Sequence, residues 1–269
     1  MTTTAPDDRR QALATVADEV RACRACPLHV GARNAVPGEG NPDAEVMLIG
    51  EAPGQNEDLQ GRPFVGASGQ FLTQMLEAAG FPRSEVFIAN VAKHRPPGNR
   101  DPLPEEIAAC AGFLQRQIDA IDPLVIVTLG RFSMARYFPG ERVSRIHGQA
   151  RVVGGRVILP LYHPAAALHQ GSLRKVLEAD FAALPGVVDR ARRRRERLKA
   201  VSTGDQVDAA PLARERGPED GSVARPERVA PVQQSFGIAG LTVPDASEAV
   251  TPRAEPETRV APPKQLPLL

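Results

Sequence analysis

The sequence predicts an α/β protein of three layers, in which helices cover both faces of a four-stranded parallel sheet. Unbroken runs of Val, Ile and Leu, such as EVMLIG at 45–50 and PLVIVTLG at 123–130, are typical of strands that are buried on both faces. Segments with helical spacing of apolar residues separate these runs, and such alternation favours a parallel sheet. Apolar residues make up 42% of the chain, which is enough for a sizeable core.

Four strands are expected in chain order. The first is 45–50, the second is EVFIAN at 85–90, the third is 123–130, and RVILPLYHP at 156–164 contains the fourth. In open α/β sheets, ligands bind beyond the carboxyl ends of the strands, so the residues that follow each strand are the first candidates for a site.

The helices between these strands carry start and stop signals. In SGQFLTQMLEAAG, residues 68–80, Ser68 is the expected N-cap and Gly80 the stop. The helix expected at 104–121 has Pro104 at its first position, followed by two acids that the helix dipole favours. Three further helices are expected at residues 9–22, 131–138 and 172–184.

A change of composition near residue 200 divides the chain. Residues 201–269 hold ten prolines, with 7 Lys or Arg against 10 Asp or Glu, and they show no sustained apolar periodicity. We expect this tail to be disordered, because it buries too little apolar surface to offset its ordering entropy. The domain expected at 1–200 is mildly basic, and it ends in a basic helix, RARRRRERLK at 190–199. This helix can add non-specific DNA affinity, and a solvated helix end is the alternative.

The chain carries few signs of export or membrane insertion. It has three cysteines, which argues against a secreted disulfide framework, and no apolar run of about 18 residues. Its N-terminus lacks the apolar region of a signal peptide. We therefore expect a cytoplasmic protein with reduced thiols.

Three polar residues stand at the ends of expected strands. Glu51 follows the first strand, Asn90 ends the second and His163 falls at the end of the fourth. An acid, an amide and an imidazole that converge at one edge of a sheet form a site-like arrangement. Each also has a structural alternative, since Glu51 could cap a helix, Asn90 could be a turn residue and His163 could simply end a strand.

Three long motifs resemble the family-four, iron–sulfur uracil-DNA glycosylases of bacteria and archaea. They are GEAPGQNEDLQGRPFVGASGQFL, NVAKHRPPGNRDPLPEEIAAC and LYHPAAAL, and the resemblance covers roughly residues 15–185. It implies the glycosylase fold and a monofunctional base-excision-repair enzyme that flips deoxyuridine out of DNA and leaves an abasic site. It also implies a monomer that acts on uracil-containing DNA in the cytoplasm, at the bacterial nucleoid.

The resemblance implies a role for several residues. Asn90 matches the amide that reads O4 and N3–H of uracil, and Phe64 matches the ring on which the base stacks. Glu51 matches the acid that orients or activates water or stabilises the cationic sugar. His163 matches the histidine that stabilises negative charge on the departing uracil. Backbone N–H groups around Ala52 and Gly54 are expected to help, and Glu57 and Asp58 are rival acids.

Four cysteines hold a [4Fe–4S] cluster in the family that this chain resembles. Cys23, Cys26 and Cys110 match the first, second and fourth, and His94 stands where the third is expected. We favour a [4Fe–4S] cluster held by the three cysteines and His94, because histidine replaces cysteine in Rieske centres. Two alternatives stay open: a zinc ion bound by the same four residues, or a loop or DNA-contacting role for His94 with the cluster held by three ligands or missing.

Basic residues in two loops are candidate DNA contacts, with solvated loops as the structural alternative. The candidates are Lys93, Arg95, Arg100, Arg145 and His147. The last two lie in SRIHGQARVVGG, residues 144–155, which the resemblance places in a loop near the DNA minor groove. A related branch captures uracil sites covalently through a histidine after Lys-Arg-Arg-Ile, of which this chain shares RIH. Uracil capture, a broader range of deaminated bases and a non-catalytic DNA-binding relative are the alternative functions.

The chain ends in a short apolar peptide, Gln265–Leu269, with the sequence QLPLL. It resembles the peptides that dock bacterial proteins onto the replication sliding clamp. A short motif at the end of a disordered tail suits such a tethered interaction.

Overall fold

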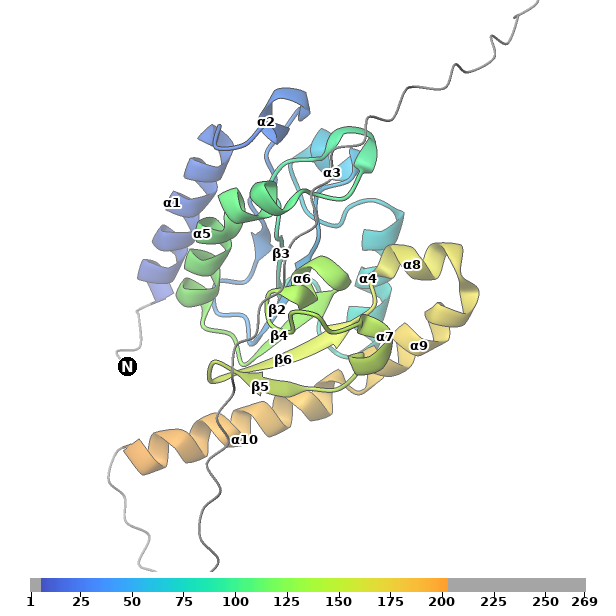
Figure 1. Cartoon of the computed structure of the whole chain (residues 1–269). Coiled ribbons are helices and arrows are strands. Elements are labelled where there is room, and N and C mark those ends of the chain that lie inside the picture. Colours follow the sequence, from blue (N-terminus) through green and yellow to red (C-terminus); the bar gives the residue numbers. More distant parts are fainter. Residues whose placement is uncertain (1–5, 203–269) are drawn as a thin grey trace, which may run out of the picture. The chain divides into compact units, whose positions relative to one another are not determined.

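The computed structural model describes residues 6–202, with the predicted strands and helices in the predicted order and several shorter elements between them (Figure 1). Residues 203–269, which include almost all of the predicted tail and the peptide Gln265–Leu269, lie outside the described residues. The elements are α1 Pro6–Ala22, α2 Leu28–Gly31, β1 Glu39–Gly40, β2 Val46–Gly50, α3 Gln55–Gln60, α4 Ala67–Ala78, β3 Phe87–Asn90, η1 Pro97–Asn99, α5 Pro104–Ile121, β4 Val125–Leu129, α6 Arg131–Ala135, α7 Val143–Ile146, β5 Arg151–Val153, β6 Arg156–Leu161, α8 Pro164–His169, α9 Gly171–Ala182 and α10 Leu184–Ser202.

Within the described residues, the sheet has six strands in the order β1-β3-β2-β4-β6-β5. Its four central strands are parallel, which confirms the predicted parallel sheet. The strands β1 and β5 pair antiparallel with the outer two and were not predicted. The region 144–155, predicted as a loop, therefore ends in a β-hairpin, whose turn is formed by Gly154 and Gly155 with φ of 56° and 83°.

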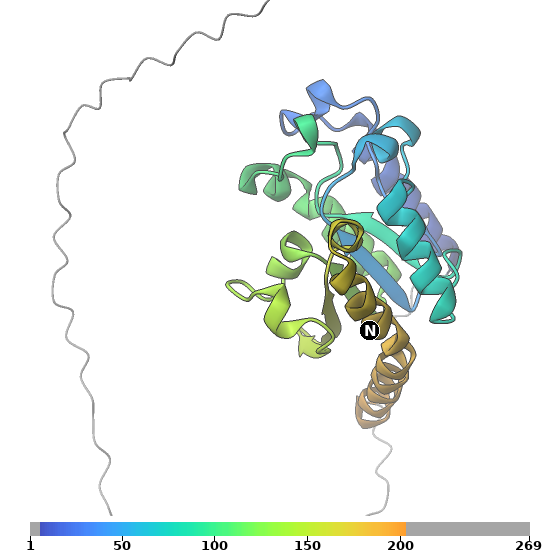
Figure 2. The ribbon, with the colours of Figure 1, turned by 90° about the vertical axis from the view of Figure 1, so that its right-hand side faces the viewer.

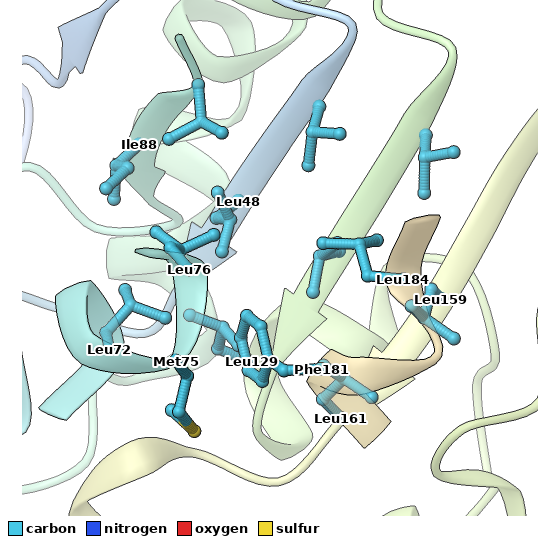
Figure 3. Close-up of a cluster of buried hydrophobic side chains, with 14 of the residues drawn as sticks. Leu48, Leu72, Met75, Leu76, Ile88, Leu129, Leu159, Leu161, Phe181 and Leu184 are labelled. Carbon is cyan, nitrogen blue, oxygen red and sulfur yellow. The ribbon is translucent and has the colours of Figure 1, made fainter. Parts of the chain in front are cut away.

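Alternating side chains of the central strands point to opposite faces of the sheet. On one face, Leu48 and its neighbours pack against α4, α9 and α10, and Figure 3 shows this cluster of buried leucines around Phe181. On the other face, Met47 and Ile49 pack against α5, α6 and α7. Helix α1 packs against α5 and lies outside it in Figure 1, and Figure 2 shows the domain with α8 and α9 toward the viewer. This is the predicted three-layer arrangement.

One predicted detail of the helices is corrected. Helix α4 begins at Ala67 with Gly66 as its N-cap residue, so Ser68 lies inside the first turn and is not the cap. The basic segment 190–199 is helical as predicted, within helix α10, which begins directly after α9. Helix α5 has the predicted bounds, and Glu106 in its first turn accepts a hydrogen bond from the N–H of Leu103 at 2.7 Å.

None of the helices within residues 6–202 is both long and apolar enough to cross a membrane.

Candidate active site

A cavity of about 270 Å³ lies at the carboxyl ends of the parallel strands. Residues from the loops after β2, β3 and β6 and from the start of α4 line it, so the fold brings together side chains that are far apart in the sequence. The lining residues are Glu51, Ala52, Pro53, Gly54, Glu57, Phe64, Ser68, Asn90, Pro96, Asn99, Arg100, His163 and Ala165. All six residues predicted for catalysis and base binding are among them.

Asn90 ends β3 beside Gly50, its partner at the end of β2. Its side chain is 1% exposed, and within the described residues its Oδ1 atom accepts no hydrogen bond. A buried acceptor without a donor costs free energy, about 1–3 kcal/mol, unless a ligand supplies the donor. The unpaired oxygen therefore indicates a binding site for a group with an N–H or O–H.

Phe64 provides an aromatic surface next to this amide. Its ring stacks against the ring of His163 with centroids 5.6 Å apart and an angle of 29° between the planes. Its backbone has φ of 51°, in the left-handed region that bulky residues rarely adopt. Gly50 makes room for both side chains, because a Cβ there would lie 2.4 Å from Asn90 Oδ1 and 2.5 Å from Phe64 Cζ.

His163 is held as a neutral hydrogen-bond donor at the start of α8. Its Nδ1 atom accepts a hydrogen bond from the N–H of Ala165 at 3.1 Å, so the ring hydrogen must be on Nε2. Burial lowers the pKa of His163 to about 4, and the nearby Glu57 opposes this shift. At neutral pH the imidazole is therefore uncharged and carries one N–H to offer to a ligand.

Glu51 is the second ionisable group predicted for the reaction. Burial, with the nearby Asp101 carboxylate, raises the pKa of Glu51 to about 7, and Arg131 opposes the shift. Asp101 and Arg131 also form an ion pair with each other. A carboxyl group with a pKa near neutrality is suited to general-base chemistry at physiological pH.

The two rival acids have structural roles. Glu57 accepts hydrogen bonds from the N–H groups of Val65 and Gly66 at 2.9 and 2.8 Å, and from Gly54 at 3.1 Å. Asp58 accepts from two N–H groups of the preceding segment 33–34. The N–H of Gly54 is thus already used by Glu57, which corrects the prediction that it is available to substrate.

The predicted cluster ligands come from three segments. Cys23 and Cys26 follow α1, Cys110 is buried in α5, and His94 is 4% exposed in the loop after β3. Burial raises the pKa of the Cys110 thiol; the adjacent Lys93 opposes this, while the nearby thiols of Cys26 and Cys23 add to it. The thiols of Cys23 and Cys26 therefore lie near enough to Cys110 to affect its pKa.

The four predicted ligands can be compared with the needs of a zinc ion and of a [4Fe–4S] cluster. Among residues 6–202, no three His, Cys, Asp or Glu side chains are close enough to bind a single metal ion. A zinc ion would bind all four ligands at one centre, whereas in a [4Fe–4S] cluster each ligand binds a different iron. Both groups take thiolate and imidazole ligands, so the donor set of Cys23, Cys26, Cys110 and His94 fits either.

Lys93 was predicted to contact DNA phosphates, and its burial corrects this. Its side chain is 1% exposed, and its Nζ atom donates to the carbonyl of Pro37 at 3.1 Å and to Gln117 Oε1 at 2.8 Å. Burial lowers the pKa of Lys93 to about 8, and Cys110 opposes the shift. Within the described residues this ammonium has no carboxylate partner, so it lacks the anion that a buried cation requires.

The other candidate DNA contacts differ in position. Arg100 lines the cavity while it binds Glu106 at 2.7 and 2.9 Å, and Arg95 donates to Asn99 at 2.7 Å. Arg145 is exposed, and neither it nor His147 is among the described residues that line the cavity.

Two features of these basic regions were not visible in the sequence. His147 Nδ1 lies 2.9 Å from Asp180 Oδ2 of α9. In α10, Arg192 binds Glu45 and Arg195 binds the carbonyl of Pro123, both of which precede parallel strands. Helix α10 therefore lies at the amino ends of the strands, opposite to the cavity.

Comparison with known proteins assigns the family. The model of the uracil DNA glycosylase superfamily matches residues 37–183. A type-4 uracil-DNA glycosylase of Sulfurisphaera tokodaii is 51% identical over 179 residues, which are 63% of this chain and 81% of that protein. The type-4 enzyme of Thermotoga maritima is 43% identical over 64% of this chain and 93% of its own length. A type-5 uracil-DNA glycosylase of Thermus thermophilus is 33% identical over 53% and 82% of the two chains. The chain belongs to the uracil-DNA glycosylase superfamily.

Proposed function

We propose that this protein is a monofunctional uracil-DNA glycosylase that hydrolyses the N-glycosidic bond of deoxyuridine in DNA. The observation that carries the proposal is the buried, unpaired Oδ1 atom of Asn90 beside the ring of Phe64. An amide offers an acceptor for uracil N3–H and a donor for O4, whereas cytosine presents the reverse pattern. A base reaches such a pocket by leaving the stack of the duplex.

In the proposed reaction, Glu51 acts on the attacking water and His163 acts on the departing uracil. The Glu51 carboxylate takes a proton from water as the water oxygen bonds to C1′ of the sugar, and it stabilises positive charge on that carbon. The bond from C1′ to N1 breaks, and its electron pair leaves with uracil. The Nε2–H of His163 donates to uracil O2, where the negative charge develops, and the N–H of Ala52 is the remaining backbone donor of the two predicted.

We further propose that Cys23, Cys26, Cys110 and His94 hold a [4Fe–4S] cluster. When bound, the cluster would supply a covalent link between segments of the chain and no step of the hydrolysis. The buried ammonium of Lys93 supports an anionic group here, because thiolate ligands would provide its missing counter-charge. Iron and sulfide content, with the visible spectrum of anaerobically purified protein, test this directly.

One assay separates the proposed function from its alternatives. The protein is incubated with uracil-containing single- and double-stranded DNA, and abasic sites are detected as strand breaks after alkali. Release of free uracil with turnover supports the proposal, and Asn90→Ala should lower it by about 10²-fold or more, as expected for loss of a buried polar contact. A heat-stable protein–DNA adduct would indicate uracil capture instead, and neither product would indicate a non-catalytic relative.

The remaining parts of the proposal concern the whole chain. We propose a domain at 1–200 that acts as a monomer on DNA in the cytoplasm, at the nucleoid, and a tail that ends in a clamp-binding peptide, Gln265–Leu269. Deleting residues 265–269 should abolish binding to a purified sliding clamp and leave uracil release from short duplexes unchanged. Unchanged clamp affinity would remove this part of the proposal.

A further inference from the structure

Arg83 contacts the strained backbone that carries Phe64. The Nη1 atom of Arg83 donates to the carbonyl of Phe64 at 3.0 Å, and Nη2 donates to the carbonyl of Pro63. The planar guanidinium therefore spans two consecutive carbonyls at the residue whose φ is 51°. A non-glycine residue keeps such a conformation when its surroundings enforce it.

The guanidinium is itself fixed by an acid from the edge of the sheet. Glu39 of β1 accepts from Nη2 of Arg83 at 2.9 Å and from Nε at 3.3 Å. Glu39 also binds Arg62, whose Nε and Nη2 atoms donate at 2.7 and 3.0 Å. The Arg83 side chain is 20% exposed, against 56% for Arg62, so the pair with Arg83 is the more protected of the two.

Two further contacts hold the same segment from its other side. Glu57 binds the N–H groups of Val65 and Gly66 at 2.9 and 2.8 Å. Gly69 of α4 packs directly against the backbone of Phe64, where a Cβ would lie 1.9 Å from the carbonyl oxygen. The carbonyls of Pro63 and Phe64 and the N–H groups of Val65 and Gly66 are thus all hydrogen-bonded. These bonds leave the Phe64 backbone little conformational freedom.

We propose that Arg83 is a positioning residue for base recognition, which holds the Phe64 ring where the flipped uracil must stack. The inference rests on the proposed glycosylase activity. It assigns a function to a residue that lies in the turn between α4 and β3, outside the motifs that surround the cavity. Loss of the guanidinium should free the backbone of Phe64 to relax, and the ring would then leave its position against His163.

The test compares Arg83→Met with Arg62→Met. Both variants remove a partner of Glu39, but among the described residues Arg62 makes no hydrogen bond to the carbonyls of Pro63 and Phe64. We expect Arg83→Met to weaken inhibition by free uracil and to lower kcat/KM on uracil-containing DNA, each by about tenfold or more, as for loss of an aromatic contact to a base. Arg62→Met should change both by less than about threefold, because its pair with Glu39 is exposed.

A double-mutant cycle separates positioning from a general effect on the fold. If Arg83 acts through the ring, Arg83→Met should have no further effect on uracil binding when Phe64→Ala is already present. Additive losses, or equal losses for Arg83→Met and Arg62→Met, would overturn the inference. A wild-type protein that releases no uracil would instead defeat the proposed function itself, so the two failures are distinguishable.

Discussion

At the scale of single residues, the site combines two ionisable groups whose pKa values are shifted in opposite directions. The pKa of Glu51 is raised to about 7, while that of His163 is lowered to about 4. Burial is the main cause of both shifts, because it disfavours the charged form of either group. Near neutral pH, His163 is therefore a fixed neutral donor and Glu51 is the group that titrates.

The first prediction concerns the pH dependence of the reaction. In the proposed mechanism the carboxylate form of Glu51 takes the proton from water, so kcat should increase with pH, with its midpoint near the Glu51 pKa of about 7. Asp101→Asn removes a charge that raises this pKa, so the midpoint should move to lower pH; Arg131→Gln should move it higher. Single-turnover rates from pH 5 to 9 measure these shifts. A midpoint that is the same in all three proteins would contradict the assignment.

The second prediction concerns the free energy of unfolding, whose change with pH follows from the raised pKa of Glu51. The folded state prefers protonated Glu51, so this contribution to stability is present below about pH 4.5 and is lost as pH rises through about 7. Glu51→Gln should therefore raise the free energy of unfolding at pH 8 by about 1–3 kcal/mol and change it little at pH 4. Urea denaturation measures the difference, with the exposed Glu85→Gln as control.

At the scale of elements, the cavity depends on how closely β2 and β3 end beside each other. Gly50 and Asn90 are register partners at the carboxyl ends of these strands, and the Phe64 ring packs over Gly50. The glycine is required by the close approach of two side chains and not by an unusual φ. One methyl group in this place would fill space that the amide and the ring already occupy.

The third prediction uses this contact. Gly50→Ala should lower kcat/KM by about 10²-fold, because Asn90 and Phe64 must both move, and should destabilise the protein by about 1–3 kcal/mol. Gly112→Ala is the matched control, since nothing lies within 4 Å of a Cβ at that position of α5. The control should gain about 0.5–1 kcal/mol from helix propensity with activity unchanged. Activity assays and thermal melts of both variants check this.

The sequence predicts the central elements well because their signals are local. Runs of Val and Ile mark the parallel strands, and Pro104 with its following acids marks the start of α5. Strands β1 and β5 have two and three residues, and their partners in the sheet determine them more than their own composition does.

The site residues were harder to predict where tertiary packing decides their environment. A lysine in a basic loop is expected to be exposed, but packing buries Lys93. Arg83 was missed because its contacts with Pro63 and Phe64 are to backbone carbonyls, and its acid partner Glu39 is 44 residues away in the sequence, so neither leaves a local pattern.

At the scale of the whole molecule, the proposed cluster joins segments that are distant in the sequence. Cys23 and Cys26 follow α1, whereas Cys110 lies in α5, the helix against which α1 packs. A cross-link between them closes a long loop, and such closure restricts the unfolded chain. The cluster would therefore stabilise the packing of α1 on the domain.

The fourth prediction tests His94 as a ligand. His94→Ala, purified anaerobically, should lose iron and visible absorbance, and its thermal midpoint should fall, whereas His94→Cys should retain the cluster because thiolate is a common ligand of iron–sulfur clusters. Arg95→Ala, one position along the same loop, is the control and should keep its iron. Full iron content with an unchanged spectrum in His94→Ala would show that another group completes the cluster.

The two short strands at the edges of the sheet have a consequence for association between molecules. An exposed edge strand offers a row of unpaired backbone groups on which a second chain can add, and long edges promote aggregation. Here β1 has two residues, preceded by Gly38 and ending in Gly40, whose φ values are 118° and 138°, and β5 has three. Edges this short are poor templates for another strand, so we expect the sheets of neighbouring molecules not to join.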